Sequence, residues 1–407
     1  MMMFGPLLER YEAVRNTTMA LAEPLSDEDC CVQSMPDASP IKWHLAHTTW
    51  FFETFVLEPF EPSFKPFHPA FRVLFNSYYN TVGDKHPRPQ RGLLTRPGMA
   101  EIEDYRSAVD ARMEALLLIA AAAPVNPWPE LARRVEIGLN HEEQHQELML
   151  TDIKHLLWCN PLLPAYSPQP AAPASPGTAL EWIPAPAGIV EIGHAGTSFC
   201  FDNELPRHRH YLEPFELASR LVDNGEYLAF IEAGGYENPE WWLSEGWDWV
   251  RTNGPAPHPL YWRRMDGTWY EYTLQGLQPL DRQNPALHLS YFEADAYARW
   301  AGARLPTEQE WECIVQNLET AGAEPWPMLQ AFDTGWQWTS SSYAPYPGYR
   351  PADGALGEYN GKFMVNQYVL RGASYATPRN HSRPSYRNFF PSHARWQFTA
   401  LRLARSR

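Results

Sequence analysis

The sequence has 407 residues, enough for two or three domains with ample cores, and its formal net charge of −15 at pH 7 argues against a protein that binds nucleic acid or anionic membranes. Its 5 cysteines are scattered and odd in number, which argues against a disulfide framework and agrees with a reducing cytoplasm. No stretch reaches the ~18 apolar residues of a membrane helix, and we expect no signal peptide in residues 1–12.

Residues 1–160 are predicted to be mainly helical, because apolar residues recur there at helical spacing. The predicted helices are Pro6–Ala22, Ile41–Val56, Met99–Ala122 and Pro129–Trp158. Four long helices favour an antiparallel bundle, a fold that builds metal sites from side chains on facing helices. The long connection over residues 57–97 is rich in aromatic and basic residues, and we expect it to form the wall of a pocket.

The last of these helices contains the segment H-E-E-Q-H, from His141 to His145. Histidines at positions i and i+4 lie on one face of a helix, so both imidazoles can reach one metal ion. A surface pair on an amphipathic helix is the simpler alternative, but the apolar neighbours of the motif disfavour it. The second predicted helix offers His44 and His47 as further ligands, and local spacing does not choose between them.

The same segment also matches H-E-x-x-H, the motif of zinc metallopeptidases. In such an enzyme Glu142 would be the general base that activates a zinc-bound water. This alternative, a zinc-dependent hydrolase, requires a third ligand downstream and a substrate cleft beside the helix. Zinc content with hydrolytic activity would identify an enzyme of this class.

The character of the chain changes after residue 160. Residues 161–185 are rich in Pro and Ala and are predicted to form a linker. In residues 186–407, short β-like runs and turns rich in Gly, Pro, Asn and Asp replace the helical periodicity. Two short helices are predicted there, Leu221–Ala233 after Ser219 and Phe292–Ala301 after Ser290. Periodicity alone therefore predicts a loop-rich α+β domain.

Several segments of this second region resemble the formylglycine-generating-enzyme/sulfatase-modifying fold, which is related to C-type lectins. The matching segments cover residues 206–217, 284–312, 336–341, 369–374 and 398–405. The most specific of them is R-L-P-T-E-x-E-W-E at residues 304–312. Such relatives use a pair of cysteines for copper chemistry, but this region has only Cys200 and Cys313, far apart, so we do not expect that activity.

The first region resembles the DinB-like bundle. L-A-H at residues 45–47, followed by H-x-x-x-H at residues 141–145, is similar to the ligand set of the ergothioneine-type sulfoxide synthases, or EgtB-like enzymes. That resemblance selects His47 over His44 and implies a metal site of His47, His141 and His145. The expected fold class is α plus α+β, with a DinB-like four-helix bundle in residues 1–160, a linker in 161–185 and a formylglycine-generating-enzyme-like domain in 186–407.

The resemblance implies a non-haem Fe(II) enzyme that uses O2. Such an enzyme joins a thiol sulfur to C2 of the imidazole of hercynine (Nα-trimethylhistidine) and oxidises the sulfur to a sulfoxide, in ergothioneine biosynthesis. Three imidazoles leave positions on iron open for other ligands, as non-haem oxygen chemistry requires. The implied partners are hercynine, cysteine or γ-glutamylcysteine, and O2, with no nucleic acid and no membrane. The expected location is the cytoplasm, and a homo-oligomer is compatible with the sequence.

Substrate contacts are also implied, position by position. Gln144 is expected near the hercynine ammonium or carboxylate. R-N-F-F at residues 387–390 stands where enzymes specific for γ-glutamylcysteine have R-N-W-D. Asn388 remains as a hercynine contact, and Phe389 offers a ring face to the quaternary ammonium. Phe390 replaces the Asp that holds the glutamyl group, and this departure makes free cysteine a candidate thiol.

The connection over residues 57–97 carries the remaining implied site residues. Arg88 and Arg91 are expected to bind the carboxylate of the thiol substrate, since Arg makes paired bonds to carboxylates; solvated loop cations are the alternative. A proton donor is needed for O2 reduction, and Tyr79, then Tyr78, is expected to supply it, because this form of the loop resembles a subgroup with such tyrosines.

Two alternatives complete the expectations. Tyr346 and Tyr349 of the second region are the other candidate proton donors. A non-catalytic, lectin-like binding module with a structural metal is a third function class, beside the sulfoxide synthase and the zinc hydrolase.

Overall fold

The computed structural model describes residues 4–122, 128–167, 177–252, 258–322, 326–351 and 354–407. The chain divides into two units, Met1–Ser167 with Asp353–Tyr359, and Pro168–Ala352 with Asn360–Arg407. The division at 167/168 falls inside the predicted linker of residues 161–185, of which residues 168–176 lie outside the described residues. Among the described residues, no helix combines the length and the hydropathy needed to cross a bilayer.

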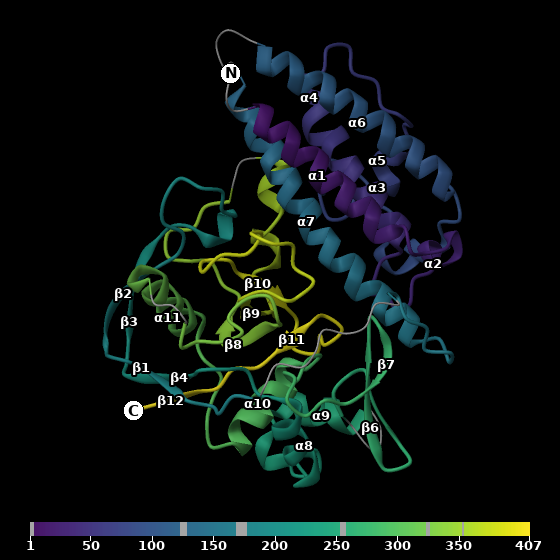
Figure 1. Ribbon diagram of the computed structural model, residues 1–407. Helices are drawn as coiled ribbons and strands as arrows, with labels where there is room; N and C mark the ends of the chain where they lie inside the picture. The colour runs from purple at the N-terminus through teal and green to yellow at the C-terminus, as the bar shows by residue number, and fades with distance from the viewer. Residues whose placement is uncertain (1–3, 123–127, 168–176, 253–257, 323–325, 352–353) are drawn as a thin grey trace. The chain divides into compact units, whose positions relative to one another are not determined.

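The described residues of the N-terminal unit form four long helices, as predicted (Figure 1). They are α1 (Phe4–Ala22), α3 (Ile41–Phe52), α6 (Met99–Ala122) and α7 (Pro129–Trp158). Helices α1 and α3 each pack against both α6 and α7. All 12 residues of α3 are buried, as expected of a helix that neighbours enclose on every side. The central helix of the unit is therefore α3.

Shorter elements connect these helices. They are α2 (Asp27–Cys31), a π-helical turn (Glu53–Leu57), α4 (Glu58–Phe60), α5 (Phe71–Leu74) and two 3-10 turns (Arg88–Leu93 and Ala355–Glu358). The π-helical turn continues directly from α3, so the predicted helix Ile41–Val56 is present but ends with a change of helix type. The last 3-10 turn comes from the distant segment that joins the N-terminal unit.

Helices α3 and α7 approach each other closely at Gly138. A Cβ atom built there would lie 2.6 Å from Cε1 of Phe52 and 3.0 Å from Cε1 of Phe51, closer than real Cβ contacts. The glycine interrupts the helix-forming pattern of α7 at a cost of about 1 kcal/mol relative to alanine, but it makes room for these two rings. The sequence of α7 thereby brings its next turn, which starts at His141, against α3.

In the described part of the C-terminal unit, the strands form four small sheets (Figure 1). Their strand orders are β1-β4-β12, β10-β9-β8-β11, β2-β3 and β5-β6-β7. The strands are β1 Trp182–Ala185, β2 Gly188–Ile192, β3 His208–Leu212, β4 Phe215–Ala218, β5 Trp262–Met265, β6 Thr268–Thr273, β7 Gly276–Pro279, β8 Trp336–Ser342, β9 Tyr368–Arg371, β10 Asn388–Phe390, β11 Thr399–Ala400 and β12 Ala404–Ser406. The pairs are antiparallel except for β8 with β11.

The C-terminal unit also contains helices, some of which begin at a side-chain cap. They are α8 (Asn224–Glu232), α9 (Ser244–Thr252), α10 (Tyr291–Trp300) and α11 (Glu308–Ala321), with 3-10 turns at Asp202–Glu204, Pro239–Trp241 and Gly361–Phe363. Ser290 caps α10 as predicted. The predicted start of α8 after Ser219 is wrong, because Asp223 forms the capping box with Glu226, and residue 222 bonds instead to the backbone of Leu401.

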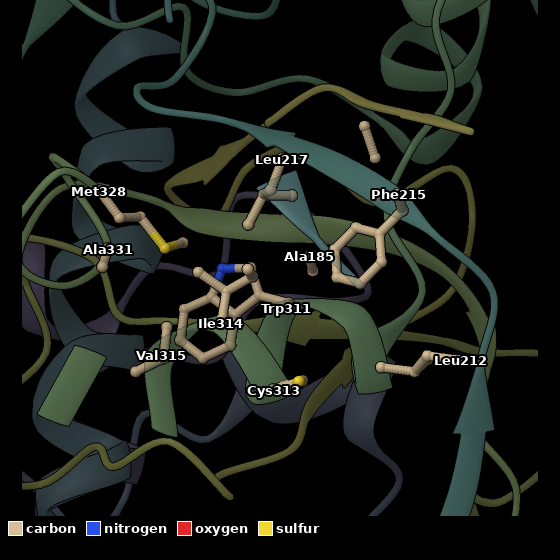
Figure 2. Packing of buried hydrophobic residues seen from close by; sticks show 11 residues of the cluster. Ala185, Leu212, Phe215, Leu217, Trp311, Cys313, Ile314, Val315, Met328 and Ala331 are labelled. Atoms are coloured by element: carbon tan, nitrogen blue, oxygen red, sulfur yellow. The ribbon is translucent and has the colours of Figure 1, made fainter. Parts of the chain in front are cut away.

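The specific R-L-P-T-E-x-E-W-E segment builds the core of this unit. Thr307 caps α11, and Glu308 binds the guanidinium groups of Arg371 and Arg387, each at 2.8 Å. Trp311 lies in a cluster of buried apolar side chains from α11, β4 and neighbouring loops (Figure 2), and its indole N–H donates to Gln337. The motif is therefore structural: its polar residues cap and pair, and its tryptophan fills the core.

Candidate metal centre

Three histidines meet where α3 packs against α7. His47 comes from α3, and His141 and His145 come from successive turns of α7. One ring nitrogen of each lies within 4.8 Å of those of the other two, and all three side chains are buried. The pair predicted from its i, i+4 spacing thus meets a third imidazole from the facing helix, as bundle metal sites require.

The hydrogen-bond partners of these rings leave nitrogens available for a metal. His47 Nδ1 lies 2.6 Å from the carbonyl oxygen of Phe75, so Nδ1 carries the proton and Nε2 keeps its lone pair. His47 Nε2 and both nitrogens of His141 have no hydrogen-bond partner among the described residues. Buried polar atoms are rarely left unpaired, and a metal ion would satisfy them here. The residues present therefore fit a metal ion held by three imidazoles.

The three imidazoles are neutral at physiological pH. Burial lowers the pKa of His47 and His145 well below the usual value, and that of His141 to about 3. The neighbouring imidazoles lower these pKa values further, since two positive rings at this distance repel each other. Neutral imidazole is the form that binds metals, so no proton has to be displaced before a metal binds.

His44 is not a member of this cluster. Its Nδ1 lies 2.8 Å from His145 Nδ1, and its Nε2 lies 3.1 Å from a carboxylate oxygen of Asp152. Both ring nitrogens are thereby engaged with other side chains. The choice between the two histidines, which spacing left open, falls to His47 because its Nε2 faces the pair on α7.

Aromatic rings surround the cluster. Trp43 stacks on His47 with ring centroids 4.5 Å apart, and Trp50 stacks on it at 5.4 Å. Phe51 packs against His141 at 4.8 Å. Such a shell fixes the imidazole planes and keeps bulk water from the nitrogens, which favours metal binding in a defined geometry.

Glu142, the second residue of the H-E-x-x-H match, faces other partners. One of its carboxylate oxygens lies 2.9 Å from the Arg15 guanidinium and the other 2.5 Å from that of Arg106. Although burial raises it, the guanidinium groups of Arg106 and Arg15 hold the pKa of Glu142 at about 2. Glu142 is therefore fixed in buried ion pairs and is not placed as the general base of a zinc hydrolase.

Comparisons with known proteins agree with both units. Residues 10–149 match the DinB superfamily, and residues 168–327 match the sulfatase-modifying factor enzyme 1-like domain. The hercynine oxygenase of Mycobacterium tuberculosis is 31% identical over 430 residues, covering 96% of this chain and 96% of that protein. The chain belongs to the hercynine oxygenase family. The Mycolicibacterium smegmatis hercynine oxygenase is 30% identical and covers 98% of each chain.

The formylglycine-generating enzymes are partial relatives of this hercynine oxygenase family member. The one from Streptomyces coelicolor is 32% identical over 181 residues, which is 37% of this chain and 54% of that protein. The likeness is therefore confined to part of the chain, whereas the likeness to hercynine oxygenases spans nearly all of it. The expected family and its two-domain architecture are confirmed.

The two arginines predicted to contact substrate differ in their surroundings. Arg91 is 4% exposed, donates to the hydroxyl oxygens of Ser39 and Ser77, and lies over the Trp43 ring at 3.3 Å. The same Trp43 ring stacks on the His47 imidazole, so both side chains contact one indole. Arg88 is exposed, and its guanidinium donates to the carbonyl oxygen of residue 37.

The predicted tyrosines lie beside the cluster, with one that the sequence did not suggest. Tyr79 is buried against Trp50 at 5.6 Å, and Tyr78 stacks on Tyr79 at 4.6 Å. The ring centroid of Tyr359 lies 5.7 Å from that of His141 and 6.1 Å from that of Tyr78. No local pattern marks Tyr359, since it follows a turn-rich stretch more than 200 residues after α7.

The other predicted residues are distributed over both units. Gln144 is half-buried on α7, directly before the second histidine of the pair. Asn388, Phe389 and Phe390 form strand β10 of the C-terminal unit, and all three are partly buried. The Phe389 ring stacks on Tyr343 with centroids 4.1 Å apart.

The alternative tyrosines of the C-terminal unit belong to its polar network. The Tyr346 hydroxyl accepts a hydrogen bond of 2.9 Å from Arg371 and lies 3.3 Å from a Glu308 oxygen. The Tyr349 hydroxyl donates to Asp202 at 2.9 Å. These phenols are thus engaged in holding the fold of this unit.

Proposed function

We propose that this protein is a sulfoxide synthase of the hercynine oxygenase type. It joins the sulfur of a thiol substrate to C2 of the hercynine imidazole and oxidises that sulfur, in ergothioneine biosynthesis. One O2 accepts the four electrons of the two oxidations: one oxygen atom becomes the sulfoxide oxygen and the other leaves as water, with the thiol and C2 hydrogens. The observation that carries the proposal is the buried cluster of three neutral imidazoles in a chain similar to hercynine oxygenases over nearly its whole length.

We propose Fe(II) as the metal, with His47, His141 and His145 as its ligands. Three neutral ligands without a carboxylate bring no negative charge, and they leave coordination positions for the substrate thiolate and O2. Iron supplies the electron transfer to O2 that zinc lacks. The protein's own contribution is a site shielded from water, because the stacked indoles of Trp43 and Trp50 enclose His47.

Arg91 is the proposed contact of the thiol substrate's carboxylate. It is a buried guanidinium that donates hydrogen bonds to two serine hydroxyls, and its Nε has no hydrogen-bond partner among the described residues. Burial of a cation is unfavourable and lowers the pKa of Arg91; the nearby Arg88 lowers it further, and Asp152 opposes the shift. A substrate carboxylate would add a negative charge and hydrogen-bond acceptors in direct contact with the guanidinium. Arg88, which is exposed, is the second proposed contact.

For the remaining substrate contacts, the proposal rests on the resemblance. Gln144, Asn388 and Phe389 are proposed to contact hercynine. The Phe389 ring stacks on Tyr343 and, at 5.7 Å, on Phe363, so it belongs to an aromatic group of the kind that attracts a quaternary ammonium. Phe390 replaces an acidic residue, and an apolar ring cannot hold the charged glutamyl amine. We therefore propose free cysteine as the preferred thiol.

The proposed proton donor is a phenol of the pair formed by Tyr78 and Tyr79. Burial, and then the neighbouring Tyr79, raise the pKa of Tyr78 well above its usual value, so the phenol is protonated at any physiological pH. Tyr359 lies near both Tyr78 and His141 and is the third candidate. A protonated phenol beside the site can deliver a proton to reduced oxygen without admitting bulk water.

The decisive experiment measures metal, oxygen and product together. Protein purified anaerobically is assayed for iron and zinc, then given hercynine with cysteine or with γ-glutamylcysteine. We expect iron, O2 uptake that requires both substrates, and a sulfoxide product by mass spectrometry, with the higher kcat/KM for cysteine. Zinc content with hydrolytic activity, or no product from either thiol, would refute the proposal. A higher kcat/KM for γ-glutamylcysteine would refute only the choice of thiol.

A further inference from the structure

A chain of hydrogen-bonded side chains stands behind one of the three candidate ligands. His145 Nδ1 lies 2.8 Å from His44 Nδ1, and His44 Nε2 lies 3.1 Å from Asp152 Oδ2. The same oxygen of Asp152 accepts a hydrogen bond of 2.8 Å from the backbone N–H of Ser39. His44 is 2% exposed and Asp152 6% exposed, so the chain is shielded from water along its length.

The partners determine where the protons of this chain lie. A carboxylate only accepts hydrogen bonds, so His44 carries its proton on Nε2 and donates it to Asp152. In the neutral ring, His44 Nδ1 is then an acceptor, and the proton shared by the two imidazoles belongs to His145 Nδ1. His145 Nε2 therefore keeps its lone pair, which is the tautomer that binds a metal through Nε2.

The three candidate ligands differ in what supports them. His47 donates its Nδ1 proton to a neutral carbonyl oxygen, and neither nitrogen of His141 has a hydrogen-bond partner among the described residues. Among the described residues, His145 is the one of the three that hydrogen bonds connect to a carboxylate, through a second imidazole. A carboxylate behind a ligand imidazole fixes the ring and makes its free nitrogen a stronger donor.

We propose that His44 and Asp152 are positioning residues of the metal centre. They form an aspartate–histidine–histidine relay that holds His145 in the Nδ1–H tautomer with Nε2 directed at the metal. The relay makes His145 the most electron-donating of the three ligands. This inference rests on the metal site of the proposed function but not on the reaction performed there, so it can be tested with metal alone.

The test uses four variants of the full-length, metal-free protein. His44→Leu removes both hydrogen bonds of the relay. Asp152→Asn keeps the size of the side chain and removes its charge. His44→Gln can still accept from His145 through Oε1 and donate to Asp152 through Nε2, so it keeps the relay without an imidazole. The matched control is Gln146→Leu, which removes an equally buried polar side chain next to His145.

The control variant lies outside the relay. Gln146 is 2% exposed, and its amide donates to the carbonyl oxygen of Val14 and the hydroxyl of Thr18. Its loss is expected to lower the stability of the bundle without altering the ring orientation of any ligand. A general effect of damaged packing on metal binding would therefore appear in this variant as well.

Co(II) is the probe, with its affinity measured by competition with a chelator and its coordination by the visible absorption spectrum. Loss of an outer partner of a metal ligand typically weakens metal binding about 10–100-fold. We expect that loss, with a shifted Co(II) spectrum, for His44→Leu and Asp152→Asn. We expect affinity close to wild type, with an unshifted spectrum, for His44→Gln and Gln146→Leu.

Either of two results would overturn the relay. One is wild-type affinity and an unchanged spectrum for Asp152→Asn; the other is equal weakening by Gln146→Leu and His44→Leu. If His44→Leu does not fold, Asp152→Asn and His44→Gln decide, since the relay requires the first to weaken binding and the second to preserve it. No hercynine or thiol is present, so a failed relay leaves the proposed reaction standing, and a wrong reaction leaves these affinities unchanged.

Discussion

The replacement Glu142→Gln separates a structural carboxylate from a catalytic one. Glu142 is 0% exposed and lies between the guanidinium groups of Arg15 and Arg106. Its pKa falls from the usual 4.5 to about 2, and at about 1.4 kcal/mol per pKa unit the ionised form is stabilised by about 3 kcal/mol. Removing one partner of a buried ion pair typically costs about 3–5 kcal/mol, in agreement with this value. We therefore expect Gln at this position to lower the free energy of unfolding by about 3 kcal/mol.

The sign of the pH dependence follows from the lowered pKa. The stability contributed by Glu142 is fully present above the unfolded-state pKa of about 4.5. It is lost as the pH falls towards the folded-state pKa of about 2, where the folded protein also takes up the proton. The difference between wild type and the Gln variant should therefore be constant from neutral pH to about pH 4.5 and shrink below it.

Hydrogen exchange of the full-length protein is the assay, followed on peptides of α7. A loss of about 3 kcal/mol corresponds to roughly 100-fold faster exchange of the most protected amides. The control is Glu130→Gln on the same helix, because the Glu130 carboxylate lies 2.9 Å from the guanidinium of Arg134 and the Glu130 side chain is 47% exposed. Exposed pairs contribute about 0–1 kcal/mol, so exchange should change by less than about fivefold.

Turnover decides between the two roles of Glu142. If Glu142 is structural, the Gln variant should keep its metal and substantial sulfoxide synthase activity, measured below the variant's lowered melting temperature. If Glu142 is a general base, the same replacement should lower turnover about 100-fold or more. Wild-type protection of α7 together with abolished turnover would show that the reasoning from the ion pairs is wrong.

Four further predictions concern the site and its supporting helix. His47→Ala should strip iron and abolish turnover, and retention of full iron by this variant would refute its place among the ligands. Tyr78→Phe and Tyr79→Phe, singly or together, should lower the ratio of sulfoxide to sulfinate product per O2 consumed; an unchanged ratio in all three variants would exclude both phenols. Arg91→Gln should raise the KM for the thiol at least about tenfold, as expected for a lost charge-assisted bond, with the KM for hercynine unchanged; equal increases in both would mean general damage. Gly138→Ala should lower stability by about 1–3 kcal/mol, since its Cβ would lie 2.6 Å from a ring carbon of α3, and an unchanged melting temperature would contradict this overpacking.

The helices of the N-terminal unit could be predicted because they are long and periodic. Helix α7 spans Pro129–Trp158, as predicted, with Pro at its first position and no later proline to interrupt it. Short elements were harder, because their ends depend on single side chains. The start of α8 was placed after Ser219, but Asp223 caps the helix. Two polar residues near the start of a predicted helix can both serve as its N-cap, and the sequence alone does not show which of them caps the helix in the fold.

The sequence of α7 predicts the two metal-binding histidines, His141 and His145, but it does not predict which residues of other elements contact them. Histidines four residues apart share a helix face whatever else the chain does. The choice of His47 depends on the Phe75 carbonyl that holds its Nδ1, and the place of His44 depends on Asp152, 108 residues later. Tyr359 is more distant still, and no periodicity connects it with His141. Contacts of this range are set by the packing of the fold and leave no local pattern.

The H-E-x-x-H match shows where such a motif stops being informative. Helix α7 carries two i, i+4 pairs side by side: His141 with His145 faces α3, and Glu142 with Gln146 bonds to side chains and backbone of α1. In any H-E-x-x-H helix, the glutamate lies about 100° around the axis from the first histidine, so its position alone cannot make it a base. The charged side chains around the glutamate decide whether it can act as a base. Here Arg15 donates to one oxygen of Glu142 and Arg106 donates to the other, and both arginines keep the carboxylate ionised. They lie 127 and 36 residues away from it in the sequence. In this fold the glutamate of the peptidase-like motif therefore forms ion pairs that fix α7, and the two histidines of the motif contribute to the metal site.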